Sequence, residues 1–343
     1  MRELNGIQYL RALAALSVLA FHISEQFGGP FKLGAAGVDV FFVISGFIMW
    51  TTTASRPTTP KRFIWRRIVR IVPLYWIITA ATALAILARP QFFYDHILTI
   101  GNFAGSLVFV PTLLDGYLHP VVIQGWTLCY EMMFYVLFAL TLFWRKGSRF
   151  WILTGVLVGI AILHPFMPGG YASAFTRPIM LEFMAGVAIG QLWLTRTRVP
   201  VAMAGALVVA GFLGFFLLDR FLPGTGRVLR WGIPAILIVA GAAFAERERS
   251  WKPLPTLRFL GDASYSIYLW HVLVGVVATA VLLHVGIPRD WRPAMIAFFS
   301  LVVSAILYLL VEKPMIAALK PARRAASGRS NPVATARGSQ HFR

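Results

Sequence analysis

The twenty residues VPVAMAGALVVAGFLGFFLL, at positions 199–218, contain no charged side chain. An α-helix rises about 1.5 Å per residue, so twenty residues span about 30 Å, which is the thickness of the hydrocarbon core of a bilayer. A surface helix of a soluble protein carries polar residues along one face, and this segment has no such face. The segment therefore predicts a helix that crosses a membrane.

The rest of the chain has the same character. It has 343 residues, of which 58% are hydrophobic and 13% are charged. Soluble domains carry about a quarter charged residues, so this chain has too few charges to cover a water-facing surface, and a soluble enzyme is excluded. The single cysteine, Cys129, excludes an internal disulfide framework and a metal site built on several cysteines, and we expect no bound metal.

The distribution of apolar runs predicts an all-α, polytopic membrane bundle of about ten transmembrane helices. The first run is not followed by a small-residue cleavage site, so we interpret it as a retained span rather than a signal peptide. The ten runs lie at 7–25, 37–54, 68–88, 126–144, 149–167, 176–194, 199–218, 229–245, 264–285 and 294–312.

The basic residues indicate the orientation of these spans. The net charge is +19, from 32 Lys and Arg against 13 Asp and Glu. In a soluble chain this balance would suggest nucleic-acid binding, but cytoplasmic loops of membrane proteins also collect Lys and Arg. If both termini are cytoplasmic and the weaker apolar segment 97–114 does not cross, 23 of the 32 basic residues lie on the cytoplasmic side and eight lie outside. We expect that topology, and no nucleic-acid partner.

The segment 97–114 and the end of the chain are exceptions to the helical pattern. Residues 97–114 lie in a long external stretch and are expected to dip into the membrane or to pack on the bundle. We expect one membrane domain over 1–318 and a disordered basic cytoplasmic tail over 319–343, near anionic membrane lipids.

Two ionisable residues lie on the first span. Arg11 and His22 are eleven residues apart, which places them on nearly the same helix face and about 16 Å apart along the axis. Ionisable residues inside spans are costly and are often functional. His22, toward the outer side, is our candidate for a catalytic base, although an Arg that reaches the lipid headgroups and a His that bonds a neighbouring helix would show the same pattern.

Two carboxylates are candidates to act with His22. Glu131 begins the fourth span at a depth comparable to that of His22, where it would orient and stabilise the imidazole, and the alternative is a hydrogen bond that holds the bundle together. Asp39, at the outer start of the second span, is suited to either of these roles, orienting His22 or holding the bundle together. Glu182 in the sixth span is expected to make an interhelical polar contact.

The stretch FIWRRIVRIVPLYW at 63–76 places a cluster of arginines at the start of a helix. Arg67 and Arg70 are three residues apart and project to one side. Guanidinium groups bind phosphate through two hydrogen bonds and remain charged. We therefore predict that Arg66, Arg67 and Arg70 bind a cytoplasmic ligand with several phosphates; anchoring to lipid headgroups is the alternative.

In these residues and their order the chain resembles the acyltransferase 3 family of bacterial membrane proteins, and in particular its exopolysaccharide-modifying acetyltransferases. The resemblance runs from about residue 4 to 315 and rests on five ordered blocks. These are YLRA at 9–12 with His22, GVDVFFVISGF at 37–47, RRIVRIVPLYW at 66–76, WTL at 126–128 with Tyr130 and Glu131, and SYSIYLWH at 264–271.

This resemblance implies a ten-helix acyltransferase in the bacterial inner membrane. It implies that His22 is the essential base and that Arg11, Arg67 and Arg70 are needed for the donor, cytoplasmic acetyl-CoA or another acyl-CoA, which is a substrate rather than a bound cofactor. The implied acceptor is a glycan hydroxyl at the outer face. Trp126, Tyr130 and His271 of the matching blocks are candidates for supporting roles. Cys129 falls at a variable position of the family and is expected to be an inert buried thiol.

The sequence thus predicts an O-acyltransferase that acts on an exopolysaccharide or cell-surface glycan, or on its lipid-linked oligosaccharide precursor. Two alternatives stay open. One is an acyltransferase that acts on a small molecule or lipid, and the other is a transporter of acyl or glycan carriers without chemistry. The absence of an inverted sequence repeat disfavours the transporter.

Overall fold

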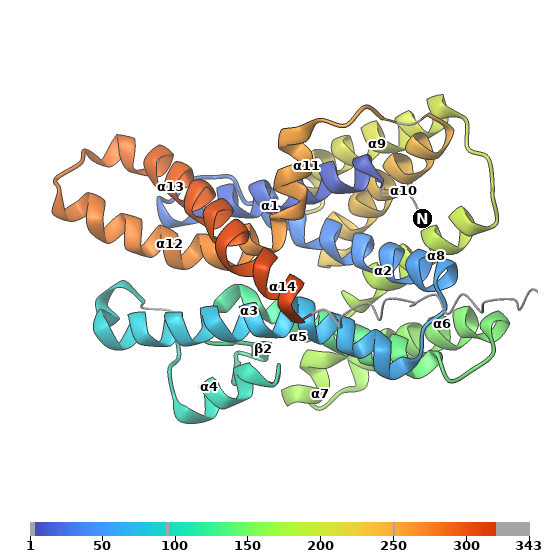
Figure 1. Cartoon of the computed structure of the whole chain (residues 1–343), viewed down its shortest axis with the longest axis horizontal. Helices are drawn as coiled ribbons and strands as arrows, with labels where there is room; N and C mark the ends of the chain where they lie inside the picture. The colour runs from blue at the N-terminus through green and yellow to red at the C-terminus, as the bar shows by residue number, and fades with distance from the viewer. Residues whose placement is uncertain (1–3, 94–95, 250, 320–343) are drawn as a thin grey trace, which may run out of the picture.

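The computed structural model describes residues 4–93, 96–249 and 251–319, and these residues form a bundle of helices with one short β-hairpin (Figure 1). The strands β1 (Leu113–Leu114) and β2 (Tyr117–Leu118) pair antiparallel. The α-helices are α1 (Asn5–Gln26), α2 (Gly37–Ser55), α3 (Pro60–Ala88), α4 (Ile100–Leu107), α5 (Trp126–Thr141), α6 (Lys146–Leu163), α7 (Gly170–Phe175), α8 (Met180–Leu194), α9 (Val201–Phe221), α10 (Ile233–Glu248), α11 (Pro255–Asp262), α12 (Ser264–His284), α13 (Arg292–Leu307) and α14 (Lys313–Leu319).

Within the described ranges, ten helical segments are long and apolar enough to cross a membrane, which confirms the predicted all-α bundle and its number of spans. The last segment is longer than expected, because α13 continues through a π-helical stretch, Tyr308–Glu312, into α14. The predicted tail lies outside the described residues, apart from Leu319 at the end of α14. The segments are Asn5–Gln26, Leu33–Ser55, Pro60–Ala88, Ile123–Thr141, Lys146–Phe166, Gly170–Leu194, Val201–Phe221, Val228–Glu248, Ser264–His284 and Arg289–Leu319.

The weaker apolar segment 97–114 has no helix long enough to cross a membrane, which agrees with the prediction that it does not span. Its helix α4 has only eight residues, a length of about 12 Å, and it lies beside α3 at the lower edge of the view (Figure 1). The buried side chain of Asn102 joins the segments before and after α4. It donates to the carbonyl of Ile97 at 2.7 Å and accepts from the backbone N–H of Thr112 at 2.8 Å. The segment therefore packs on the bundle.

Helix α2 forms the centre of the bundle. In the apolar window of its span 78% of residues are buried, against 11% for the span of α6 and 17% for that of α9. It packs closely against α8 because both helices carry glycine at the crossing. A Cβ on Gly46 would lie 2.1 Å from the carbonyl oxygen of Phe183, and one on Gly186 would lie 2.0 Å from that of Val43. In lipid, burial of apolar surface alone does not drive helices together, and small residues at a crossing let two helices approach closely enough to pack.

The start of α1 is fixed by a residue from another helix. Its N-cap, Leu4, offers no side-chain hydrogen bond. Instead Glu246 of α10 accepts from the backbone N–H groups of Asn5 at 2.7 Å and Gly6 at 2.6 Å. A carboxylate at this position satisfies two free donors and complements the positive end of the helix dipole. Helix α1 is thereby anchored to α10 at a defined depth.

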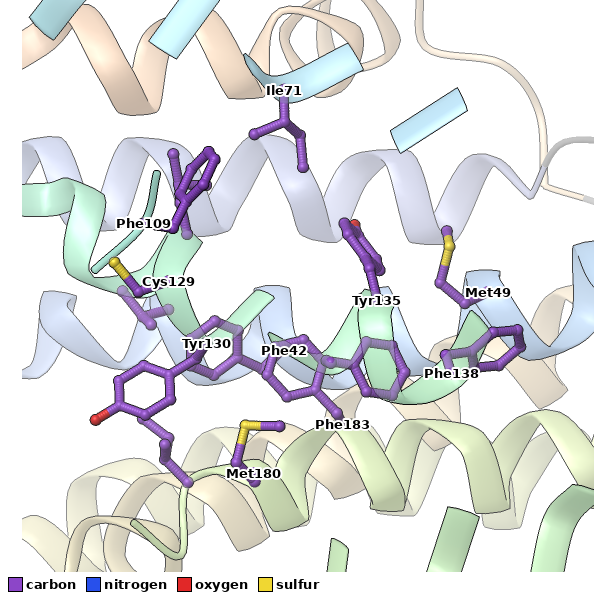
Figure 2. Close-up of a cluster of buried hydrophobic side chains, with 14 of the residues drawn as sticks. Phe42, Met49, Ile71, Phe109, Cys129, Tyr130, Tyr135, Phe138, Met180 and Phe183 are labelled. Carbon is purple, nitrogen blue, oxygen red and sulfur yellow. The ribbon is translucent and has the colours of Figure 1, made fainter. Parts of the chain in front are cut away.

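Aromatic side chains fill the space between α2, α5 and α8. Phe183 stacks on Phe42 and on Phe134, with ring centroids 4.5 Å apart in both pairs. Cys129 lies buried within the same cluster (Figure 2), and its thiol contacts the carbonyl of Gly125 at 3.5 Å. This apolar position agrees with the inert thiol expected from the sequence.

Candidate active site

Among the described residues, two cavities between the helices are lined by predicted site residues. The first, which we call the arginine cavity, has a volume of about 120 Å³. Its walls come from α1, α2, α3, α5 and α12, so it lies between segments that are distant in the sequence. Its polar lining residues are Arg11, Ser45, Arg67, Arg70, Thr127, Glu131, Tyr135, Ser264, Tyr265 and Tyr268.

The three arginines of this cavity lie near acidic groups: Glu131 lines the cavity, and the charges of Asp262 and Glu312 also act on Arg11. Arg11 donates to Ser264 Oγ at 2.9 Å and to Gln8 Oε1 at 3.2 Å. Arg67 Nε is buried without a hydrogen-bond partner, and its guanidinium lies 5.8 Å from the ring centre of Tyr135. Among the described residues no ion pair within 4.0 Å involves Arg11, Arg67 or Arg70. The cavity is therefore suited to an anionic ligand.

Arg66 does not belong to this group. Its side chain is exposed and lies outside the lining of the arginine cavity. The helical period does not separate Arg66 from Arg70, since residues four apart lie about 40° from each other around the axis; what sets Arg66 apart is its exposed side chain. Two of the three arginines predicted on this helix thus line the cavity, and the binding role of all three stays a prediction.

Glu131 also lines the arginine cavity, where its carboxylate accepts hydrogen bonds from Ser45 at 3.1 Å and from Tyr135. The sequence-based expectation placed it beside His22. The carboxylate that contacts His22 is instead Glu25, one helical turn along α1, with Oε2 3.6 Å from His22 Nδ1. Glu131 thus lies among the arginines, and Glu25 is close enough to act on His22 through its charge.

The second cavity, which we call the histidine cavity, is larger, with a volume of about 630 Å³. This falls in the range of about 300–1,000 Å³ that is usual for sites of small ligands. Its wall combines aromatic, cationic and titratable groups. The lining residues with aromatic, cationic or titratable side chains include His22, Glu25, Lys32, Trp126, Arg227 and Trp231.

The two cavities adjoin. Val38 and Tyr268 line both of them, and the Tyr268 hydroxyl is held by hydrogen bonds at 2.9 Å to Thr127 Oγ1 and to the carbonyl of Gln124. Helix α1 presents Arg11 to the arginine cavity and His22 to the histidine cavity. This is the separation in depth that the eleven-residue spacing predicts.

His271, a predicted supporting residue, is brought next to His22. The two imidazole rings have centroids 5.2 Å apart, and His271 is only 3% exposed. The other two supporting candidates differ from each other. Trp126 lines the histidine cavity, whereas the hydroxyl of Tyr130 donates to the carbonyl of Ala174 at 2.7 Å and so holds α5 against α7.

Asp39 is fully buried and forms an ion pair with Arg227. Arg227 Nη2 lies 2.7 Å from Asp39 Oδ2, and Nε lies 3.1 Å from Oδ1. The guanidinium is also 4.7 Å from the ring centre of Trp231. Both carboxylate oxygens of Asp39 accept from Arg227, which holds that guanidinium at the wall of the histidine cavity; the catalytic part predicted for Asp39 stays a prediction.

Sequence reasoning missed Arg227, which precedes α10 in the connection after α9. One signal was available. A buried aspartate in an apolar span needs a cation, and few basic residues lie on the side predicted to be external. Pairing Asp39 with a specific one of them still required the fold, because the two residues are 188 positions apart.

Replacing Arg227 tests the importance of this buried pair. Arg227→Gln leaves the buried carboxylate of Asp39 without its cation and is expected to destabilise the protein by about 3–5 kcal/mol, with part of the loss restored by adding Asp39→Asn. Arg230→Gln is the matched control, because the pair of Arg230 with Asp219 is 3.7 Å long and partly exposed and is worth about 0–1 kcal/mol. Thermal unfolding in detergent measures both, and equal losses would contradict the assignment.

Comparison with known proteins places this sequence in a family. Residues 4–312 match the acyltransferase domain family named acyltransferase 3. The exopolysaccharide production protein ExoZ of Rhizobium meliloti is 39% identical over 304 residues, which cover 87% of this chain and 94% of ExoZ. The acyltransferase MdmB of Streptomyces mycarofaciens is 27% identical, over 97% of this chain and 95% of MdmB.

A third relative is larger than this chain. The peptidoglycan O-acetyltransferase OatA of Listeria monocytogenes is 24% identical over 90% of this chain but only 55% of its own length, so the chain spans about half of that relative. No solved structure matches the chain. Because the family match extends over residues 4–312 and a relative is 39% identical over nearly its full length, the chain belongs to the acyltransferase 3 family of membrane acyltransferases.

Proposed function

We propose that the protein is an O-acyltransferase that moves an acetyl or other short acyl group from cytoplasmic acyl-CoA to a hydroxyl of an exopolysaccharide or of its lipid-linked precursor. The observation that carries this proposal is the pair of adjoining cavities, one with unpaired arginines and the other with His22. The names of the relatives support the acceptor class, since they include an exopolysaccharide production protein and a peptidoglycan O-acetyltransferase.

The donor enters from the arginine cavity. Arg11, Arg67 and Arg70 bind the phosphates of coenzyme A through charge-assisted hydrogen bonds. The small volume of the cavity, about 120 Å³, suits a thin extended chain such as the thioester arm better than a sugar ring. With the predicted orientation this cavity faces the cytoplasm, where acyl-CoA is available, and the histidine cavity faces the outer side of a cell inner membrane.

The acceptor hydroxyl lies in the histidine cavity. His22 takes its proton as the oxygen attacks the thioester carbonyl; the new C–O bond forms, the C–S bond breaks, and His22 returns the proton to the departing thiolate. Glu25, whose Oε2 lies 3.6 Å from His22 Nδ1, stabilises the imidazolium through its charge. Trp126 and Trp231 provide aromatic surface for the apolar face of a sugar ring. The protein thus supplies a base, a fixed alignment of two substrates and a site shielded from bulk water.

Removing the base tests the reaction. His22→Ala is expected to lower acyl transfer by about 10²- to 10⁴-fold, the usual contribution of a positioned base, while the protein still accumulates in the membrane. The measurement is the O-acetyl signal in proton NMR spectra of surface polysaccharide from three strains, with the gene deleted, restored, or restored as His22→Ala. A normal signal in the His22→Ala strain contradicts the role of His22. Identical spectra from all three exclude the polymer as acceptor and favour a small-molecule or lipid acceptor, or a transporter.

Neighbouring arginines on α3 test the donor site. Arg67→Ala and Arg70→Ala are each expected to raise the apparent KM for acetyl-CoA by about 10- to 100-fold, because a hydrogen bond to a charged group is worth about 1.5–3 kcal/mol. Arg66→Ala is the control, since its side chain lies outside the cavity, and its KM is expected to be unchanged. Transfer of radiolabelled acetyl groups in membrane vesicles gives these values. Equal effects at all three positions would favour a general role of basic charge at the membrane surface.

A further inference from the structure

His271 has one nitrogen whose role the fold explains and one whose role it leaves open. Its Nδ1 lies 2.9 Å from the backbone carbonyl of Ile267. A carbonyl oxygen only accepts hydrogen bonds, so Nδ1 must carry a proton. In the neutral ring Nε2 then has a free lone pair. That atom is buried and has no hydrogen-bond partner among the described residues.

A buried acceptor without a partner is unfavourable. If His271 only filled space, an apolar side chain of similar size would do so without this cost. The ring that lies next to it is that of His22, with centroids 5.2 Å apart. Helices α1 and α12 pack against each other. Nearer the start of both helices, Arg11 Nη2 donates a hydrogen bond to Ser264 Oγ at 2.9 Å. The relative position of the two imidazoles is therefore set by the packing of two helices.

We propose that His271 is a positioning residue for the catalytic base, and that its Nε2 lone pair accepts a hydrogen bond from an imidazole N–H of His22 when His22 carries the substrate proton. This inference rests on the proposed function, which makes His22 the base. The imidazole of His22 has two nitrogens, so the N–H that His271 accepts is on the nitrogen that does not exchange a proton with the substrate, and Glu25, 3.6 Å from Nδ1, acts on the imidazolium through its charge rather than through a hydrogen bond.

The proton balance needs no further reactant. The proton leaves the acceptor hydroxyl, resides on His22 while the C–O bond forms, and passes to the thiolate as the C–S bond breaks. His271 receives a hydrogen bond only, and it stays neutral throughout. It stabilises the charged intermediate without holding the proton, so its loss affects turnover rather than donor binding.

The test compares four variants in membrane vesicles from a polymer-producing strain that lacks its own copy of the gene. The variants are His271→Leu, His271→Gln, His284→Leu and His22→Ala. Transfer of radiolabelled acetyl groups from acetyl-CoA to endogenous glycan is measured against donor concentration and divided by the amount of folded enzyme. His284, exposed at the end of the same helix, is the matched control.

We expect His271→Leu to lower turnover by about 10- to 100-fold, the range for a hydrogen bond to a charged group, with the apparent KM for acetyl-CoA unchanged. His271→Gln, whose amide oxygen is an acceptor, is expected to recover most of the turnover, and His284→Leu to match the unmodified enzyme. A purely structural role would not produce this rescue or this separation of turnover from KM.

Full turnover in His271→Leu beside an inactive His22→Ala overturns this inference alone. Equally low turnover in His271→Leu and His271→Gln also overturns it. Full activity in His22→Ala overturns the proposed base itself, and with it the role of His271.

Discussion

The eleven-residue spacing of Arg11 and His22 along α1 sets the geometry on which the site depends. In the hydrocarbon core the backbone cannot give up its internal hydrogen bonds, so α1 acts as a rigid spacer about 16 Å long between the two residues. Glu246 anchors its first turn, and Ser264 of α12 bonds Arg11. The cation and the histidine are therefore held at fixed depths, one in each cavity.

The two cavities differ in whether their arginines form ion pairs. Asp39 neutralises Arg227 with two hydrogen bonds, so this cation is part of the wall. In the arginine cavity Glu131 is bonded to Ser45 and Tyr135, and among the residues described Arg11, Arg67 and Arg70 form no ion pair within 4.0 Å. Arg67 Nε also has no hydrogen-bond partner among them. These are the donors that the phosphates of the proposed acyl-CoA would bind.

Much of this arrangement could be predicted from local sequence. Apolar runs predicted the spans because bilayer thickness dictates their length, and the number of residues between Arg11 and His22 determined their separation. The exposure of Arg66 was not predictable in this way, since Arg66, Arg67 and Arg70 all lie within about 100° of one another around the helix; only the packing of α3 shows which of them line the cavity. The pairing of Asp39 with Arg227 was not accessible in the same way, and neither was the position of Glu131, because both depend on how α2, α5 and α10 pack. Depth along a helix is a local property, whereas the choice of neighbours is not.

In the proposed reaction acyl groups pass from a donor on the cytoplasmic side to an acceptor on the other side through the two adjoining cavities. Sealed inside-out vesicles from a polymer-producing strain test it most directly, since their outer surface is the cytoplasmic face. Radiolabelled acetyl-CoA added outside is predicted to acetylate glycan enclosed in the vesicle lumen, whereas sealed right-side-out vesicles given the same donor are predicted to show no transfer. Equal transfer in both preparations, or label confined to the donor side, would contradict the account.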